Sequence, residues 1–319
     1  MLKPCRTVCM VSVVLAGLGV GTASGQDYPA NPIRVITSPA GGGNDFVARL
    51  VARAISGPLG QQVVVDNRAT RLIADIVAKS PPDGYTLLVT GSAHWIGPLL
   101  EKVTYDPIRD FASITLIDRA PSILVVHPSM PVKSVKQLIA LAKARPGELN
   151  FAVGGPGSSN FIGAILFNHM AKVNIVRIPY KGTGPAMTAV MSGEVHAMLA
   201  SAGGAATHVK SGRLRALAVG SAKGSPLAPG LPTIAEAGIP GYVSEALHAL
   251  LAPAKTPPAI VARLNQEVTR YLHSPEAKDI FLKSGTEPAP TSPEEFTAIM
   301  KSENSKIGEV LKAAGIGIQ

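Results

Sequence analysis

Cysteine is almost missing from this chain, whose 319 residues include only Cys5 and Cys9. Both lie near the N-terminus, ahead of the centre of an apolar stretch. If that region is removed during export, the mature chain holds no cysteine. Its absence excludes a disulfide, a thiolate nucleophile and a cysteine-bound metal from the mature protein.

The first 25 residues have the features of an export signal. Positive charge precedes an apolar stretch over 9–20, and small residues at 23–25 suit cleavage. A membrane anchor is the alternative, but a span needs about 20 apolar residues, and several glycines interrupt this stretch. We therefore expect residues 1–25 to be a signal peptide, cleaved near Gly25/Gln26, and the mature protein to be periplasmic.

Aromatic residues are also scarce, at 4% of the chain, and acidic residues are outnumbered. The 30 Lys and Arg residues stand against 21 Asp and Glu, which gives a formal net charge of +9. The basic residues are scattered, with few aromatics among them, whereas nucleic-acid surfaces combine clustered positive charge with stacking rings. We expect no nucleic-acid partner, and only a mild attraction to anionic ligands.

The chain lacks the short motifs of the common enzyme classes. It has no Gly-x-Ser-x-Gly elbow and no phosphate loop ending in Gly-Lys-Ser/Thr, and the run Gly41-Gly42-Gly43 lacks the last glycine of a dinucleotide fingerprint. No two of its seven histidines lie three or four residues apart, which excludes helical metal pairs. We therefore expect no enzyme, no cofactor and no metal, although Ser158 and His94 could still meet across a cleft.

Two glycine-rich turns each follow an apolar strand and lead into a helical pattern. The first runs from Pro39 to Asp45 after the strand 33–37, and the second runs from Gly154 to Asn160 after the strand 150–153. A helix that begins at such a turn leaves backbone N–H groups free at its positive end, which suits an anion. Two such turns predict two α/β lobes that hold one anionic ligand between them.

Apolar runs of strand length alternate with helical patterns along most of the chain. Runs of β-branched residues such as Val63-Val64-Val65 indicate strands buried on both faces, which is typical of parallel sheets covered by helices. The pattern predicts an α/β fold with strands at 33–37, 62–66, 85–90, 114–118, 123–127, 150–153, 175–180, 197–201 and 215–219.

The C-terminal quarter predicts a strand at 246–251 and two helices, at 258–272 and from 293 to about 314. We expect these helices to return to the first lobe, so that the chain crosses between lobes near 126–131 and near 242–249. Lobe 1 would then comprise 26–127 plus 245–319, and lobe 2 would comprise 128–244. Two crossings form a hinge, and a hinged cleft closes around ligands.

These residues together resemble one family. The matching segments are Pro39–Asp45, Pro81–Leu87, Tyr105–Pro107 with Asp110-Phe111, Val132–Val135, Gly157-Ser158, Ile178–Gly182, Gly212–Ala218, Leu231–Gly238 and Leu250–Pro253. In this order they are similar to the Bug-type (TctC-like) solute receptors of tripartite tricarboxylate transporters. The resemblance implies a type II periplasmic binding fold, in which each lobe is a mainly parallel sheet flanked by helices and two strands form the hinge.

The resemblance also implies a function. Family receptors clamp small organic acids and deliver them to a two-component membrane permease driven by an ion gradient. We expect a monomeric receptor for a small carboxylate, with a sensor that signals without transport as the alternative. The ligand-binding residues expected on this basis are Pro39, Ala40, Gly41, Gly42, Gly43, Asn44, Asp45, Ser92, His94, Gly157, Ser158, Ser159, Asn160, Tyr180 and Lys181.

Several of these residues have a second interpretation. Asp45 suits a helix cap, although it could instead bind a ligand ammonium. His94, beside Trp95, forms either a pocket wall or part of the core, and Lys181 either meets a distal carboxylate or lies on the surface. Three features depart from the family pattern: the loop after Arg68 is shortened, Asn160 stands where a His is usual, and Ala200 stands where an Asp is frequent. Arg71, near the rim of the shortened loop, either adds a positive charge to the site or points into solvent.

Overall fold

The computed structural model describes residues 28–155 and 158–317. The expected signal peptide, both cysteines and the binding residue Gly157 lie outside these ranges. The elements are β1 Ile33–Thr37, α1 Gly43–Leu59, β2 Val63–Asn67, α2 Thr70–Ala78, β3 Thr86–Gly91, α3 Ala93–Ile96, η1 Gly97–Leu99, β4 Phe111–Val126, α4 Val135–Ala144, β5 Asn150–Val153, α5 Ser159–Ala171, β6 Val176–Pro179, α6 Thr183–Met191, β7 Ala197–Ser201, α7 Ala202–Lys210, β8 Arg215–Val219, β9 Glu245–Pro253, α8 Pro258–Leu272, α9 Pro275–Lys283, β10 Glu287–Pro288 and α10 Pro293–Ala313.

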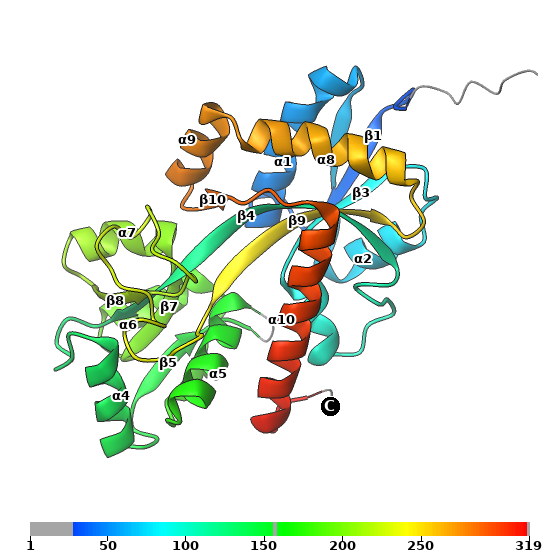
Figure 1. Ribbon diagram of the computed structural model, residues 1–319. Helices are drawn as coiled ribbons and strands as arrows, with labels where there is room; N and C mark the ends of the chain where they lie inside the picture. The colour runs from blue at the N-terminus through cyan, green and yellow to red at the C-terminus, as the bar shows by residue number, and fades with distance from the viewer. Residues whose placement is uncertain (1–27, 156–157, 318–319) are drawn as a thin grey trace, which may run out of the picture.

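The strands form a ten-stranded sheet in the order β2-β1-β3-β9-β4-β7-β5-β6, with β8 and β10 also paired to β4. The outer strands are parallel, because β1 pairs with β2 and β3 in that sense and β5 pairs likewise with β6 and β7. Strands β4 and β9 run antiparallel to their neighbours and connect the two parallel groups (Figure 1). The fold is that of a two-lobed periplasmic binding protein with a two-strand hinge.

Strand β4 corrects one expectation. The sequence indicates separate strands at 114–118 and 123–127, but a single strand covers Phe111–Val126. The polar segment around Pro121 resembles a loop in sequence, yet its residues pair with the start of β9, and the partner of β4 changes to β7 at Ser122. The two groups of strands are therefore joined by one continuous β4, with no loop between residues 118 and 123.

Helices cover both faces of the sheet because their apolar stripes match its buried side chains. Helices α1, α8 and α9 pack on β1, β3 and β9 in one cluster of buried residues, and α6 and α7 pack on β5 and β7 in another. Ser134 caps α4 as expected, since its Oγ accepts a hydrogen bond from the Gln137 amide. The predicted helices at 258–272 and 293–314 are confirmed as α8 and α10.

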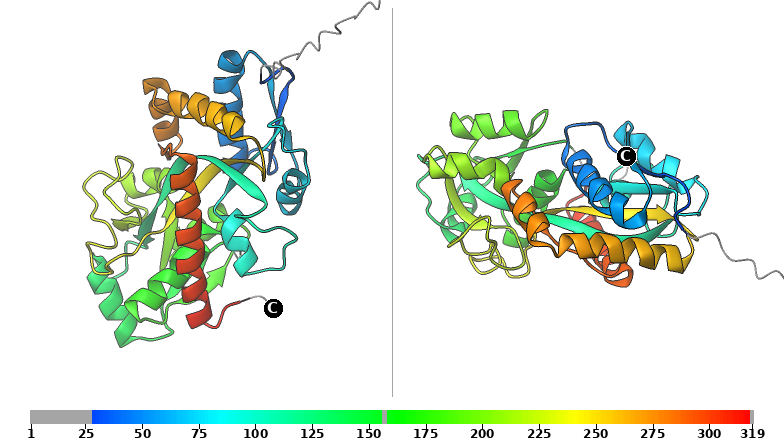
Figure 2. Two further views of the ribbon diagram at one scale, coloured as in Figure 1. Left: turned by 45° about the vertical axis from the view of Figure 1, so that its right-hand side comes forward. Right: turned by 90° about the horizontal axis from the view of Figure 1, so that it is seen from above.

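Helix α10 contacts elements of both expected lobes. It contacts α3, β4 and α5, and Figure 1 shows it running from the hinge strands to the level of α5. The two halves of the molecule also contact each other beside the hinge strands, where α7 approaches the segment that follows α9. A Cβ built on Gly203 would lie 3.0 Å from the Gly285 Cα. Figure 2 shows α7 and α9 facing each other across this junction.

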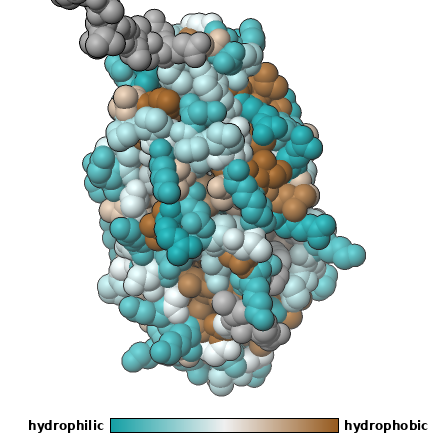
Figure 3. All heavy atoms as spheres, turned by 90° about the vertical axis from the view of Figure 1, so that its right-hand side faces the viewer, coloured by the Kyte–Doolittle hydropathy of each residue, from teal (hydrophilic) through white to brown (hydrophobic). Residues whose placement is uncertain are grey.

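The surface mixes polar and apolar side chains. In Figure 3 hydrophilic residues project between smaller hydrophobic areas, so apolar side chains on this face are divided among several small areas. The large hydrophobic residues with the greatest exposure are Phe46, Val64, Leu72 and Val176. Within residues 28–155 and 158–317, no helix combines the length and apolar character that crossing a membrane requires.

Candidate functional site

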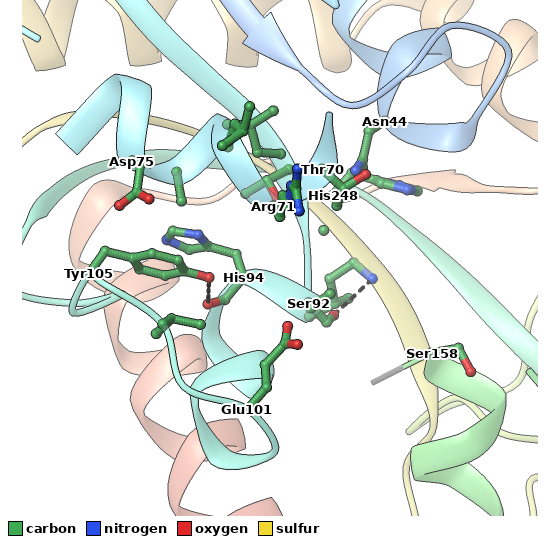
Figure 4. Close-up of a pocket in the computed structure, with 18 of the residues that line it drawn as sticks. Asn44, Thr70, Arg71, Asp75, Ser92, His94, Glu101, Tyr105, Ser158 and His248 are labelled. Atoms are coloured by element: carbon green, nitrogen blue, oxygen red, sulfur yellow. Dashed lines mark hydrogen bonds between the residues drawn. The ribbon is translucent and has the colours of Figure 1, made fainter. Parts of the chain in front are cut away.

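A cavity of about 850 Å³ lies where the two glycine turns meet. It is bounded by the start of α1 at Asn44, the start of α5 at Ser158 and Ser159, the last residues of β3 and the first residues of β9. The segments Thr70–Asp75 and Glu101–Tyr105 complete its lining. Figure 4 shows Ser158 approaching from α5 on one side, and Asn44, Arg71 and His248 on the other. The turns therefore converge on one shared space.

The first turn is held in shape by Asp45. Its Oδ2 accepts a hydrogen bond from the Gly41 backbone N–H at 3.0 Å, and its Oδ1 accepts one from the Asn67 side-chain Nδ2 at 2.8 Å. The Arg49 Nε forms an ion pair with the same Oδ1 at 2.9 Å. Gly41 has a φ of +87°, a left-handed conformation that favours glycine. The Gly41 N–H is therefore used inside the protein, which corrects its expected role as a ligand donor.

The charge of Asp45 is strongly stabilised. Burial alone would raise the pKa of Asp45, but the hydrogen bonds from Gly41, Arg49 and Asn67 and the charge of Arg49 outweigh burial and lower it to about 2. Asp45 is 5% exposed and does not line the cavity. The carboxylate therefore holds the loop in shape through the Gly41 amide, although it caps none of the first N–H groups of α1.

The rest of this turn leads to the cavity. Residues 39–43 are exposed at the apex, and Asn44 is the member of the turn that lines the cavity. A Cβ built on Gly91 would lie 3.3 Å from the Asn44 Oδ1, and one built on Gly43 would lie 3.0 Å from the His248 Nε2. The first N–H groups of α1 have no partner within the helix, and Gly43, the first residue of α1, packs against the His248 ring.

The second turn is held in shape by hydrogen bonds to the Asn160 side chain. Its Oδ1 accepts the Gly154 amide at 3.1 Å and lies 2.7 Å from the Ser158 Oγ. The Asn160 Nδ2 is buried and has no hydrogen-bond partner in the described chain. Ser158 and Ser159 line the cavity, but Asn160 lies behind them. Asn160 therefore shapes the turn and corrects the expectation that it lines the site.

Ser92 lies where β3 meets the hinge strand β9. Its backbone N–H donates to the Leu247 carbonyl at 3.1 Å, and its Oγ accepts the Leu247 amide at 3.3 Å. These bonds continue the β3–β9 pairing beyond the ladder and place the Ser92 side chain on the cavity wall, as expected.

His94 lies in the wall of the cavity but is 3% exposed. Its ring stacks on Tyr105 with centroids 4.9 Å apart and meets Phe111 edge-on (Figure 4 shows the first pair). Burial lowers the pKa of His94 to about 4, partly offset by the Pro107 backbone, so the ring is neutral. Trp95 is fully buried and donates its indole N–H to Glu303 on α10, which makes it a core residue instead of a pocket wall.

Two expected residues lie elsewhere. The Tyr180 hydroxyl donates to Glu194 at 3.1 Å and Lys181 is exposed, and the lining of the cavity within the described ranges includes neither. They follow β6, the outermost strand of the sheet, so its end does not reach the hinge. Ala200, the third departure from the family pattern, is a fully buried residue of β7 opposite Ile123.

The structure adds residues that the sequence interpretation undervalued. The shortened loop after Arg68 becomes the first turn of α2, so Thr70 and Arg71 line the cavity and Figure 4 shows Arg71 beside His248. His248 was one histidine among seven, and only its position inside an apolar strand pattern marked it. Among residues 28–155 and 158–317, no group of three or more His, Cys, Asp or Glu is arranged to hold a metal.

Residues 47–316 match the family model described as "Tripartite tricarboxylate transporter family receptor". The chain belongs to this family, the TctC family. It is 34% identical to Protein BugT of Bordetella pertussis, over 97% of this chain and 98% of that protein. These TctC proteins form a family of periplasmic solute-binding receptors, not of enzymes.

Two solved TctC-type structures were determined with small acids. The chain is 35% identical to R. palustris Rpa4515 with adipate, with a TM-score of 0.78 over 92% of this chain and 100% of that one. It is 29% identical to MatC from Rhodopseudomonas palustris with bound malate, with a TM-score of 0.72 over 89% of this chain and 100% of that one.

Proposed function

We propose that this protein is a periplasmic receptor that captures a small organic acid between two lobes and delivers it to a two-component membrane permease of the tripartite tricarboxylate type. The observation that carries the proposal is the single cavity bounded by the starts of α1 and α5. Backbone N–H groups at two helix starts bind a carboxylate well, because such charge-assisted hydrogen bonds are short and strong.

The division of the chain belongs to the same proposal. We assign 26–127 and 245–319 to lobe 1 and 128–244 to lobe 2, with closure by bending of β4 and β9. Export with removal of residues 1–25 would place the receptor in the periplasm, where we expect it to act as a monomer. The two relatives with adipate and malate support a dicarboxylate-sized ligand.

A thermal-shift screen tests the binding step. Adipate, malate and related acids are compared with uncharged analogues of the same length. A ligand present at 100 times its Kd adds about 2.7 kcal/mol to the free energy of unfolding, so a binding acid raises the melting temperature clearly. Stabilisation by the uncharged analogues alone would contradict the carboxylate assignment.

Delivery to a permease needs a separate experiment. Uptake of a radiolabelled acid that binds is compared between cells with and without the receptor gene, in the presence of the permease genes. Loss of uptake supports transport. Unchanged uptake together with a lost transcriptional response supports the sensor alternative.

A further inference from the structure

His248 lies where three elements of the cavity meet. Strand β9 carries it, β4 places Asp118 directly opposite in the ladder, and α1 begins next to its ring. Its Nδ1 lies 2.6 Å from the Asp118 Oδ1. The Asp118 side chain is fully buried, and its second oxygen has no hydrogen-bond partner within the described ranges. A buried carboxylate of this kind requires a compensating charge.

The second ring nitrogen of His248 faces the start of α1. A Cβ on Gly43 would lie 3.0 Å from Nε2, and a Cβ on Gly91 would lie 3.7 Å from the Cδ2 beside it. Because Nδ1 is engaged by Asp118, Nε2 is the nitrogen that remains for a ligand. The His248 ring therefore lies close to the start of α1, and a side chain at position 43 would crowd its Nε2.

We propose that His248 is a ligand-contact residue that determines specificity, donating its Nε2–H to the ligand carboxylate seated at the start of α1, with Asp118 as the positioning residue. This inference rests on the proposed function and goes beyond it. The glycine turns bind through backbone amides, whereas His248 adds a side-chain donor that Asp118 holds in place at one end of the cavity and that carries positive charge when protonated. A carboxylate is then preferred over an amide or alcohol of the same shape.

The charged groups around the ring favour its protonated form. Burial lowers the pKa of His248, but the charge of Asp118 and its hydrogen bond outweigh burial, and the net pKa is raised. Asp45 on α1 is engaged by Gly41, Asn67 and Arg49, away from the ring. The other charged side chains that line the cavity are Arg71 and Asp75 on α2, and Glu101 and Lys102 on the segment after η1. On the hinge strands, Arg119 and Glu245 line a different cavity.

Calorimetric titration with adipate or malate, whichever shifts the melting temperature more, tests the contact. We expect His248→Gln to weaken binding by roughly 10–100-fold, the range typical of a lost charge-assisted hydrogen bond. The matched control is His273→Gln, an exposed histidine at the end of α8, and we expect its affinity to stay within about twofold of wild type. Equal affinity for His248→Gln and wild type would overturn the inference and leave the proposed function intact.

A second measurement does not depend on the variant's folding. A bound carboxylate favours the protonated imidazolium of His248, so the wild-type protein should take up protons on binding at about pH 8. This uptake appears as a dependence of the binding enthalpy on the ionisation enthalpy of the buffer.

Asp118→Asn should weaken binding more at about pH 8 than at about pH 6, because without the Asp118 charge the His248 ring loses its proton more readily. Binding without proton uptake, and with the same pH profile in Asp118→Asn, would overturn the inference. A wild-type protein that binds no carboxylate would overturn the proposed function as well.

Discussion

At the scale of single residues, the structure separates side chains that touch the cavity from those that hold its walls. Asp45 and Asn160 occupy the two glycine turns, yet the hydrogen bonds of each are made within the protein: Asp45 bonds to Gly41 and Asn67, and Asn160 bonds to Gly154. Asn44, Ser92, Ser158 and Ser159 line the space. A short polar residue at a helix start has the same appearance in sequence whether it caps the turn or binds a ligand, so residue type alone did not distinguish the two roles.

Asp45→Asn tests whether the Asp45 carboxylate stabilises the first glycine turn. The substitution keeps the shape of the side chain but removes the charge that Gly41, Asn67 and Arg49 engage. We expect urea unfolding to show a loss of roughly 1–3 kcal/mol at neutral pH. Asp279→Asn is the matched control, because its pair with Lys283 is exposed on α9, and we expect it to change stability by less than about 0.5 kcal/mol.

The same variant has a pH signature. Because the pKa of Asp45 in the folded protein lies at about 2, below its ordinary value of 3.8, its contribution to stability is fully present above pH 3.8 and is lost as the pH falls through about 2. We expect Asp45→Asn to unfold with a shallower dependence on pH over this acidic range. An equally steep loss in the variant would show that other carboxylates dominate acid unfolding.

At the scale of helices and strands, local patterns correctly predicted the elements whose ends are marked by turn residues, prolines or capping residues. Strand β1 and helix α8 follow the expected ranges, and the capping box at Ser292 and Glu295 marks the start of α10. Strand β4 was missed as a unit because Pro121 and its polar neighbours resemble a loop. Their pairing with β9 is a contact between segments more than a hundred residues apart, which no local pattern contains.

Helix α5 depends on a close approach that only glycine permits. A Cβ on Gly163 would lie 2.8 Å from the Leu199 Cδ1 and still nearer to the Ser244 Oγ. We expect Gly163→Ala to cost about 1–3 kcal/mol, the usual range for overpacking. Gly308→Ala on α10 is the control, because its Cβ would meet Leu99 at an ordinary 3.6 Å, and Ala should be neutral or better there. Thermal melts of both variants give the comparison, and equal stability would contradict tight packing at Gly163.

At the scale of the whole molecule, the cavity is built at the hinge. Strands β4 and β9 connect the two parallel groups, and His248 of β9, which pairs with Asp118 of β4, lies next to the start of α1. A ligand held between the starts of α1 and α5 therefore links both halves of the molecule, and bending of the two strands changes the separation of these starts.

Small-angle X-ray scattering tests this closure. We expect saturating adipate or malate to decrease the radius of gyration of the wild-type protein, because contacts from both lobes favour the closed form. A non-binding analogue of the same size serves as the control. An unchanged radius in a sample that calorimetry shows to be saturated would mean that the acid binds without hinge motion.

The sequence by itself determined the α/β class, most strand positions, the two glycine turns and the family, because these follow from local periodicity, turn residues and motif order. Tertiary structure alone decided which of the expected residues share a space. It leaves Tyr180 and Lys181 outside the lining of the cavity, adds His248 to that lining, and settles that Arg71, expected near the rim, lines the cavity. The physical reason is that a site between two lobes depends on the pairing register of distant strands, and a single β4–β9 register places Asp118 opposite His248.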